Sequence, residues 1–134
     1  MNVQSSISRH WHHIDATDKT LGRLASEAAK LLIGKGKVNF AYHIDQGDYV
    51  VVTNAAKIKV TGGNKPTDKK FYRHSGYMGN LKETNLATML VEKPDRVIMN
   101  AVKGMLPNNK TRDNMLRRLK VYVGTDHKHN QISA

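Results

Sequence analysis

The sequence predicts an α/β domain in which helices pack against a small, mostly parallel β-sheet and an extended basic loop lies at the surface. Segments typical of strands alternate with amphipathic helical segments along the 134 residues. Residues 49–53 (Tyr-Val-Val-Val-Thr) form a short, nearly continuous β-branched run, which is typical of a strand buried on both faces of a parallel sheet. No internal repeat or linker divides the chain, so we expect a single domain over residues 1–134.

The N-terminal half contains three further predicted elements. Residues 11–15 are aromatic and polar, which indicates an early or edge strand. Leucines and alanines recur at helical spacing over 21–32, and Gly34 marks the end of this helix. Residues 58–61 predict another short strand, which a glycine pair ends.

The C-terminal half predicts a basic hairpin or loop followed by helices. Residues 64–80 are rich in lysine, glycine and aromatic side chains and have no helical period, so we expect them to be extended at the surface. Prolines at 94 and 107 end the two helices that follow. The remaining predicted elements are a short helix over 86–91, a helix over 95–106, a helical segment over 111–118, a strand over 121–123 and a polar, loosely held tail over 125–134.

The charge balance indicates a polyanionic partner. The chain has 22 Lys and Arg against 11 Asp and Glu, a net charge of +11 and a pI near 10.0. Phosphates neutralised by such a chain release condensed counterions, which favours binding to nucleic acid. An acidic lipid surface is a weaker possibility, because the cations do not lie opposite one strongly apolar helical face. The excess is concentrated in residues 57–82, with seven basic and one acidic side chain, and in residues 103–134, with seven and two.

Other features of the composition narrow the class of protein. The absence of cysteine excludes disulfides and thiolate catalysis, and it fits a reducing compartment. No window approaches the roughly 18 apolar residues of a membrane helix, and residues 1–8 lack the pattern of a secretory signal. We therefore expect a cytoplasmic protein without a membrane partner.

Two short motifs suggest catalysis only weakly. Residues 61–65 (Thr-Gly-Gly-Asn-Lys) lack the spacing of a phosphate-binding P-loop, so a tight turn is the better interpretation. Asp45 and Asp48 flank Gly47 and could hold the magnesium ion of a nuclease. A turn stabilised by aspartate side chains explains both without chemistry.

The histidines form two clusters along the chain. His10, His12 and His13 lie together, as do His127 and His129. Imidazoles ligate metals, but no H-E-x-x-H motif or set of three defined ligands is present. We expect these side chains to contact RNA or solvent and expect no metal site.

The two basic segments differ in kind. Within 69–77 (Lys-Lys-Phe-Tyr-Arg-His-Ser-Gly-Tyr) cations alternate with aromatic rings, so that phosphates can be neutralised while rings stack on unpaired bases. Within 110–120, apolar residues such as Met115 face a core and leave the cations on the outer face. Either segment could be an ordinary solvated surface. Their coincidence with the two maxima of charge favours RNA contact.

Seven ordered blocks of the sequence resemble the bacterial-type large-subunit ribosomal protein thirteen family. Together they extend over nearly the whole chain, so we expect a core over about 11–124 with short polar ends. The blocks are Trp11 with Asp15-Ala16, Leu21 to Ser26, Gly47 to Ala55, Lys59 to Gly62, Tyr72 to Tyr77, Ala101 to Pro107 and Leu119 to Gly124.

The resemblance implies a three-layer α/β/α domain and a role without catalysis, cofactor or metal. It implies that the chain binds large-subunit ribosomal RNA early in assembly, beside neighbouring large-subunit proteins in the cytoplasmic ribosome, without forming a homo-oligomer. The RNA contacts implied position by position are Lys19, Arg23, Lys35, Lys37, His43, Lys57, Lys59, Lys65, Lys69, Lys70, Tyr72, Arg73, His74, Lys103, Lys110, Arg112, Arg117, Arg118 and Lys120.

One departure from the family pattern and two alternatives accompany this expectation. Arg112-Asp113 stands where the family usually has a Gly-Arg pair, and loss of the glycine changes which backbone conformations the turn can adopt. The first alternative is a regulatory protein that binds messenger RNA outside the ribosome. The second is a metal-dependent nuclease that uses Asp45, Asp48 and nearby histidines.

Overall fold

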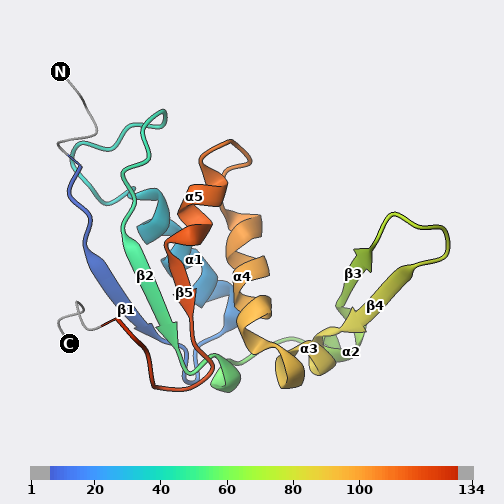
Figure 1. The fold of residues 1–134 in the computed structure, drawn as a ribbon. Helices are drawn as coiled ribbons and strands as arrows, with labels where there is room; N and C mark the ends of the chain where they lie inside the picture. Colours follow the sequence, from blue (N-terminus) through green and yellow to red (C-terminus); the bar gives the residue numbers. More distant parts are fainter. Residues whose placement is uncertain (1–6, 130–134) are drawn as a thin grey trace.

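The computed structural model describes residues 7–129 as one mixed α/β domain with a projecting hairpin (Figure 1). The predicted polar ends at 1–6 and 130–134 lie outside the described residues. In chain order the elements are β1 (Trp11–Asp15), α1 (Leu21–Ile33), β2 (Tyr49–Thr53), a 3₁₀ turn η2 (Ala55–Lys57), α2 (Lys65–Asp68), β3 (Lys70–His74), β4 (Leu81–Asn85), α3 (Leu86–Glu92), α4 (Pro94–Met105), α5 (Arg112–Arg117) and β5 (Leu119–Val121).

The main sheet consists of three parallel strands with β2 in the centre, in the order β1-β2-β5. Ile14 is level with Val52 across one pairing, and Val50 is level with Leu119 across the other. Val50, Val51 and Val52 are fully buried, as the continuous β-branched run predicts. The predicted α/β class with a small parallel sheet is confirmed.

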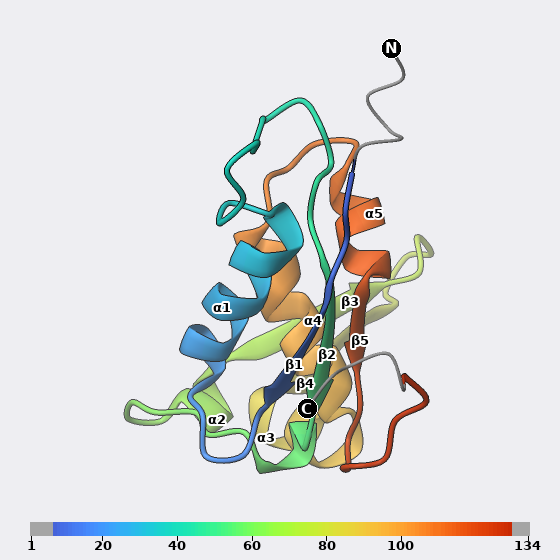
Figure 2. The same ribbon diagram turned by 90° about the vertical axis from the view of Figure 1, so that its left-hand side faces the viewer.

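Helices α1 and α4 pack against each other and cover one face of this sheet (Figures 1 and 2). Leu24 and Leu32 of α1 are fully buried, as is Ile98 of α4. The predicted C-terminal end of α1 is confirmed, because Gly34 adopts the left-handed conformation (φ 83°) and donates its N–H to the Lys30 carbonyl. None of the helices within residues 7–129 has the length and apolar composition that a membrane crossing requires.

Among the described residues, the second face of the sheet carries the segment 125–129 and no long helix. The third, helical layer that the resemblance implies is therefore replaced by irregular chain. Trp11 stacks between Tyr49 (ring centroids 4.4 Å apart) and His129 (4.8 Å). The Tyr122 hydroxyl is 2.9 Å from Nε2 of His129. The predicted loosely held tail is attached to the sheet at His127 and His129, whose rings contact those of β1, whereas Thr125, Asp126 and Lys128 are exposed.

Strands β3 and β4 form a separate antiparallel hairpin that projects beyond α3 and α4 (Figure 1). Phe71 is half-buried against the core, whereas Tyr72 and Tyr77 are 62% and 79% exposed. The predicted extended hairpin is confirmed, but the short helix α2 that precedes it was not predicted. Asn64 and Pro66 start that helix within a segment that has no helical period.

The predicted strand over 58–61 is wrong. Asn54 adopts a left-handed conformation (φ 58°) and η2 follows at once, so the chain turns away from the sheet after β2. Lys59 forms a single bridge with Thr20, in which the Leu21 N–H donates to the Lys59 carbonyl at 2.9 Å. The strand predicted over 121–123 instead spans Leu119–Val121. Just beyond it, the Tyr122 N–H donates a hydrogen bond to the Val52 carbonyl of β2 at 2.8 Å.

Candidate nucleic-acid interface

Two clefts flank α4 near the base of the hairpin. The first, the hairpin cleft, has a volume of about 580 Å³ and lies between β3–β4 on one side and α3 and α4 on the other. The second, the α1 cleft, has a volume of about 760 Å³ and is bounded by the start of α1, residues 60–69 and the second half of α4. Asn100 of α4 lines both clefts, so the two are adjacent.

Five exposed cations surround the hairpin cleft. They come from both strands of the hairpin, from the segment between α3 and α4, and from α4 itself: Arg73, Lys82, Lys93, Arg96 and Lys103. Within residues 7–129, none of the five has a carboxylate at ion-pair distance. Like charges held together in this way repel one another, and an anionic ligand relieves that repulsion.

Three further cations line the α1 cleft. Arg23 lies in the first turn of α1, whereas Lys65 and Lys69 lie at either end of α2. All three are exposed. The Lys69 ammonium lies 5.7 Å from the centre of the Phe71 ring, which links this cation to the base of the hairpin.

The two clefts bring together six of the residues that the sequence analysis proposed as RNA contacts. These are Arg23, Lys65, Lys69, Tyr72, Arg73 and Lys103. The predicted contacts Lys35, His43, Lys57, Lys110, Arg112, Arg117 and Lys120 line neither cleft.

Three cations of the clefts were not predicted as contacts: Lys82, Lys93 and Arg96. Lys93 and Arg96 belong to the segment 83–102, in which acidic residues outnumber basic ones, so charge summed along the chain conceals them. In the folded chain, the carboxylate of Glu83 pairs with Lys70 at 3.6 Å. It therefore does not neutralise Lys93 or Arg96, although all three belong to the same stretch of sequence. Charge grouped by helical face would have indicated Arg96 and Lys103, which are seven residues apart on α4.

Four other predicted contacts are exposed but engaged within the chain. Lys19 pairs with Glu27 at 3.2 Å, and Lys59 pairs with Asp18 at 3.1 Å. Lys70 forms the pair with Glu83. The His74 Nδ1 atom accepts a hydrogen bond from the Gly76 N–H at 2.9 Å. Exposed ion pairs of this kind exchange readily, so these cations stay accessible to phosphate.

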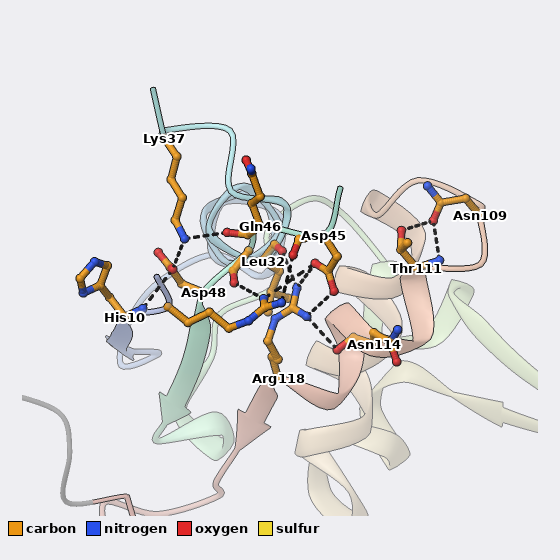
Figure 3. A network of polar contacts seen from close by, with 12 residues as sticks. His10, Leu32, Lys37, Asp45, Gln46, Asp48, Asn109, Thr111, Asn114 and Arg118 are labelled. Atoms are coloured by element: carbon orange, nitrogen blue, oxygen red, sulfur yellow. Dashed lines mark hydrogen bonds and ion pairs between the residues drawn. The ribbon is translucent and has the colours of Figure 1, made fainter. Parts of the chain in front are cut away.

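Arg118, predicted as an RNA contact, instead lies inside the protein (Figure 3). Its residue exposure is 6%, and its guanidinium nitrogens donate to both carboxylate oxygens of Asp45 at 2.6 Å. One of them also donates to the Leu32 carbonyl at 3.1 Å. Helical periodicity places Arg118 on the outer face, but α5 ends at Arg117, and the side chain turns inward instead.

Lys37 is held in the same polar network (Figure 3). Its ammonium lies 2.7 Å from Asp48 Oδ1 and donates to the Gln46 carbonyl at 2.6 Å. Asp48 also accepts from the His10 N–H at 3.1 Å and lies 2.8 Å from His12 Nε2. Asp45 and Asp48 are thus neutralised by cations of the chain, which disfavours the magnesium site of the nuclease alternative.

The histidine clusters are dispersed over the sheet. His12 contacts Asp48, and His13 Nε2 lies 2.9 Å from Thr53 Oγ1. His127 lies 5.9 Å from His13, ring to ring. Within residues 7–129, no group of three or more His, Asp or Glu side chains is placed to hold a metal ion.

Comparison with known proteins identifies the family of the chain. The family model for ribosomal protein L13 matches residues 9–128. The chain belongs to the ribosomal protein L13 family. It is 55% identical over 124 residues to the large ribosomal subunit protein uL13 of Alcanivorax borkumensis, covering 92% of this chain and 87% of that protein. For the uL13 protein of Lawsonia intracellularis the identity is 56% over 123 residues, covering 92% and 85%.

Membership of the L13 family confirms the resemblance stated from the seven sequence blocks. The matched region contains both clefts, the hairpin and the polar network around Arg118.

The Arg118–Asp45 pair predicts a large difference between two similar substitutions. Asp45→Asn leaves the Arg118 guanidinium buried without a full counter-charge and should lower the free energy of unfolding by about 3–5 kcal/mol. Asp18→Asn disrupts the exposed pair with Lys59 and should change it by less than about 1 kcal/mol. Urea denaturation at neutral pH measures both. Equal losses in the two variants would contradict the structural role of Arg118.

The Asp48 carboxylate predicts a loss of stability in acid. Burial opposes its ionisation, but hydrogen bonds from Lys37 and the His10 N–H and the contact with His12 outweigh it, so the pKa of Asp48 lies below its ordinary value of 3.8. Because the folded pKa is the lower one, Asp48 stabilises the fold above pH about 4, and this stabilisation is lost as the pH falls through the folded pKa. Denaturation from pH 6 to pH 2 should show a shallower acid dependence in Asp48→Asn. An unchanged profile would rule this contribution out.

Proposed function

We propose that this chain is a structural constituent of the large ribosomal subunit, which binds large-subunit ribosomal RNA through the two clefts beside α4 and supports early assembly of the subunit. Its relatives carry the name large ribosomal subunit protein. The role is one of binding and shaping, without catalysis. Its partners are the RNA and neighbouring proteins of the subunit, in the cytoplasmic ribosome.

The observation that carries this proposal is the convergence of eight exposed cations on two adjacent clefts. They come from α1, α2, the hairpin and the helices after it, segments that are far apart in the sequence. Neutralisation of phosphates supplies affinity and position but no sequence information. Selectivity comes from the shape of the folded RNA, since its phosphates must match cations that stand on separate elements of the domain and the hairpin.

The hairpin extends this face away from the domain. Tyr72 and Tyr77 are exposed aromatic rings on it, suited to stacking on unpaired bases. We extend the proposed contact set to Lys82, Lys93 and Arg96 and assign Lys37 and Arg118 to the stability of the fold. The remaining predicted contacts lie outside both clefts and stay predictions: Lys19, Lys35, His43, Lys57, Lys59, Lys70, His74, Lys110, Arg112, Arg117 and Lys120.

Charge reversal in the hairpin cleft tests the RNA face directly. The double variant Arg73→Glu, Lys103→Glu should weaken binding to large-subunit RNA by about tenfold or more, because two charge-assisted phosphate contacts are lost. The slope of log K against log salt should fall by roughly 0.7–0.9 for each lost contact.

The matched control is Lys30→Glu with Lys128→Glu, two exposed cations outside both clefts. It changes the net charge by the same amount, so it reports the effect of overall charge alone. Filter binding at several salt concentrations measures both double variants. Equal weakening would show that the clefts have no special part in binding.

Sedimentation tests the assignment to the ribosome. An epitope-tagged chain should migrate with large subunits on a sucrose gradient at physiological salt. A chain found free of subunits would contradict the proposal. Recovery on messenger RNA instead would support the regulatory alternative, which uses the same basic face.

A further inference from the structure

We propose that the hairpin cleft is a pocket for one unpaired nucleotide of the bound RNA, whose base enters the cleft while its flanking phosphates lie on the cationic rim. This inference rests on the proposed function and makes it specific. It distinguishes a pocket that reads an extruded base from a basic surface that reads only the RNA backbone.

The floor of the hairpin cleft is apolar. Phe71, Met89, Met99 and Leu116 line it, and all four are half-buried against the core. An aromatic ring and two flexible thioethers form a surface that can adapt to the flat face of a base. A volume of about 580 Å³ lies within the range of pockets that enclose a small ligand.

The rim of the cleft is cationic. Arg73 and Lys82 stand on the hairpin side, and Lys93, Arg96 and Lys103 stand on the opposite side. Glu92 is the acidic residue among those lining the cleft. A strand whose base points down between these two rows would place its phosphates against cations on both sides.

Two neutral polar side chains also line the cleft. The Asn100 amide offers donors and an acceptor, and the Thr84 hydroxyl offers both. Within residues 7–129, neither side chain forms a hydrogen bond. A base carries donors and acceptors along its edge, and an amide is suited to bind such an edge.

The combination of floor and rim favours an unpaired nucleotide over other anionic ligands. A duplex keeps its bases stacked inside, so it would contact the rim and leave the apolar floor exposed. An acidic peptide would likewise neutralise the rim without a planar apolar group for the floor. An extruded nucleotide satisfies both, because it joins a flat apolar ring to a phosphate.

The methionines of the chain provide a test that needs no substitution. Four of the six methionines serve as reporters: Met89 and Met99 lie in the hairpin cleft, Met105 lines the α1 cleft, and Met115 is in the core. With methyl-¹³C methionine in the full chain, titration with the trinucleotide ApApA should shift the methyl signals of Met89 and Met99 and leave Met105 and Met115 in place. A short blunt RNA duplex and hexaglutamate should leave all four signals nearly unchanged.

A variant that fills the cleft gives a second measurement. Asn100→Trp should weaken ApApA binding by about fivefold or more, since the base loses a stacking position worth at least about 1 kcal/mol. The control is Asn114→Trp, at another exposed asparagine on a helix, outside both clefts. It should bind ApApA as the natural chain does.

The outcomes separate this inference from the proposed function. If duplex or hexaglutamate moves Met89 and Met99 as far as ApApA does, or if ApApA moves neither, the pocket is overturned. In that case retained binding of large-subunit RNA would leave the proposed function intact. If the natural chain does not bind large-subunit RNA, both the pocket and the proposed function are overturned.

Discussion

The loop 45–48 crosses the C-terminal end of α1 so closely that no side chain fits at Gly47, where a Cβ atom would overlap the Leu32 carbonyl. The Asp48 N–H donates to the Leu31 carbonyl, and Arg118 donates to the Leu32 carbonyl at the same helix end. This crossing satisfies backbone acceptors that a helix otherwise leaves without partners. It also fixes where β2 begins, and through Arg118 it fixes where β5 begins. The order of the parallel strands β1-β2-β5 depends on this junction.

Burial separates the cations of the polar network from those around the hairpin cleft. Arg118 is buried and Lys37 is half-buried, and both have carboxylate partners, at 2.6 and 2.7 Å, because an unpaired charge in such an environment would be costly. The cations around the hairpin cleft lie in solvent, where leaving them without a partner costs little. Arginine and lysine therefore stabilise the fold in the polar network, whereas around the hairpin cleft they are available to bind an external anion. Net charge alone does not distinguish these uses.

Much of the fold could be predicted from the sequence, because periodicity reports burial directly. The valine run of β2 and the leucine stripe of α1 were placed within a residue or two of their bounds. The strand predicted over 58–61 is wrong, although its apolar pattern does report burial, since Ile58 is buried. The segment pairs with Thr20, at the start of α1, and not with the sheet. Pattern shows that a residue is buried and does not show what covers it.

Part of the candidate site could also be predicted from the sequence, but the role of Arg118 could not. The loop cations Lys69 and Arg73 stand in a segment of obvious charge excess. Arg118 does too, yet its partner Asp45 is 73 residues earlier in the chain. Such a pairing is visible only in three dimensions.

That separation has a consequence for how the molecule forms. The central strand β2 leaves the ribosome that synthesises it well before β5, the strand that covers its second edge. Until residues 118–121 emerge, Asp45 lacks the Arg118 guanidinium that binds both its carboxylate oxygens, although Arg9 lies 4.0 Å from it, and β2 presents an open second edge. A nascent chain of this protein therefore cannot complete its sheet until β5 (Leu119–Val121) has been made. The hairpin and α4, which line the proposed RNA-binding clefts, are both made before β5.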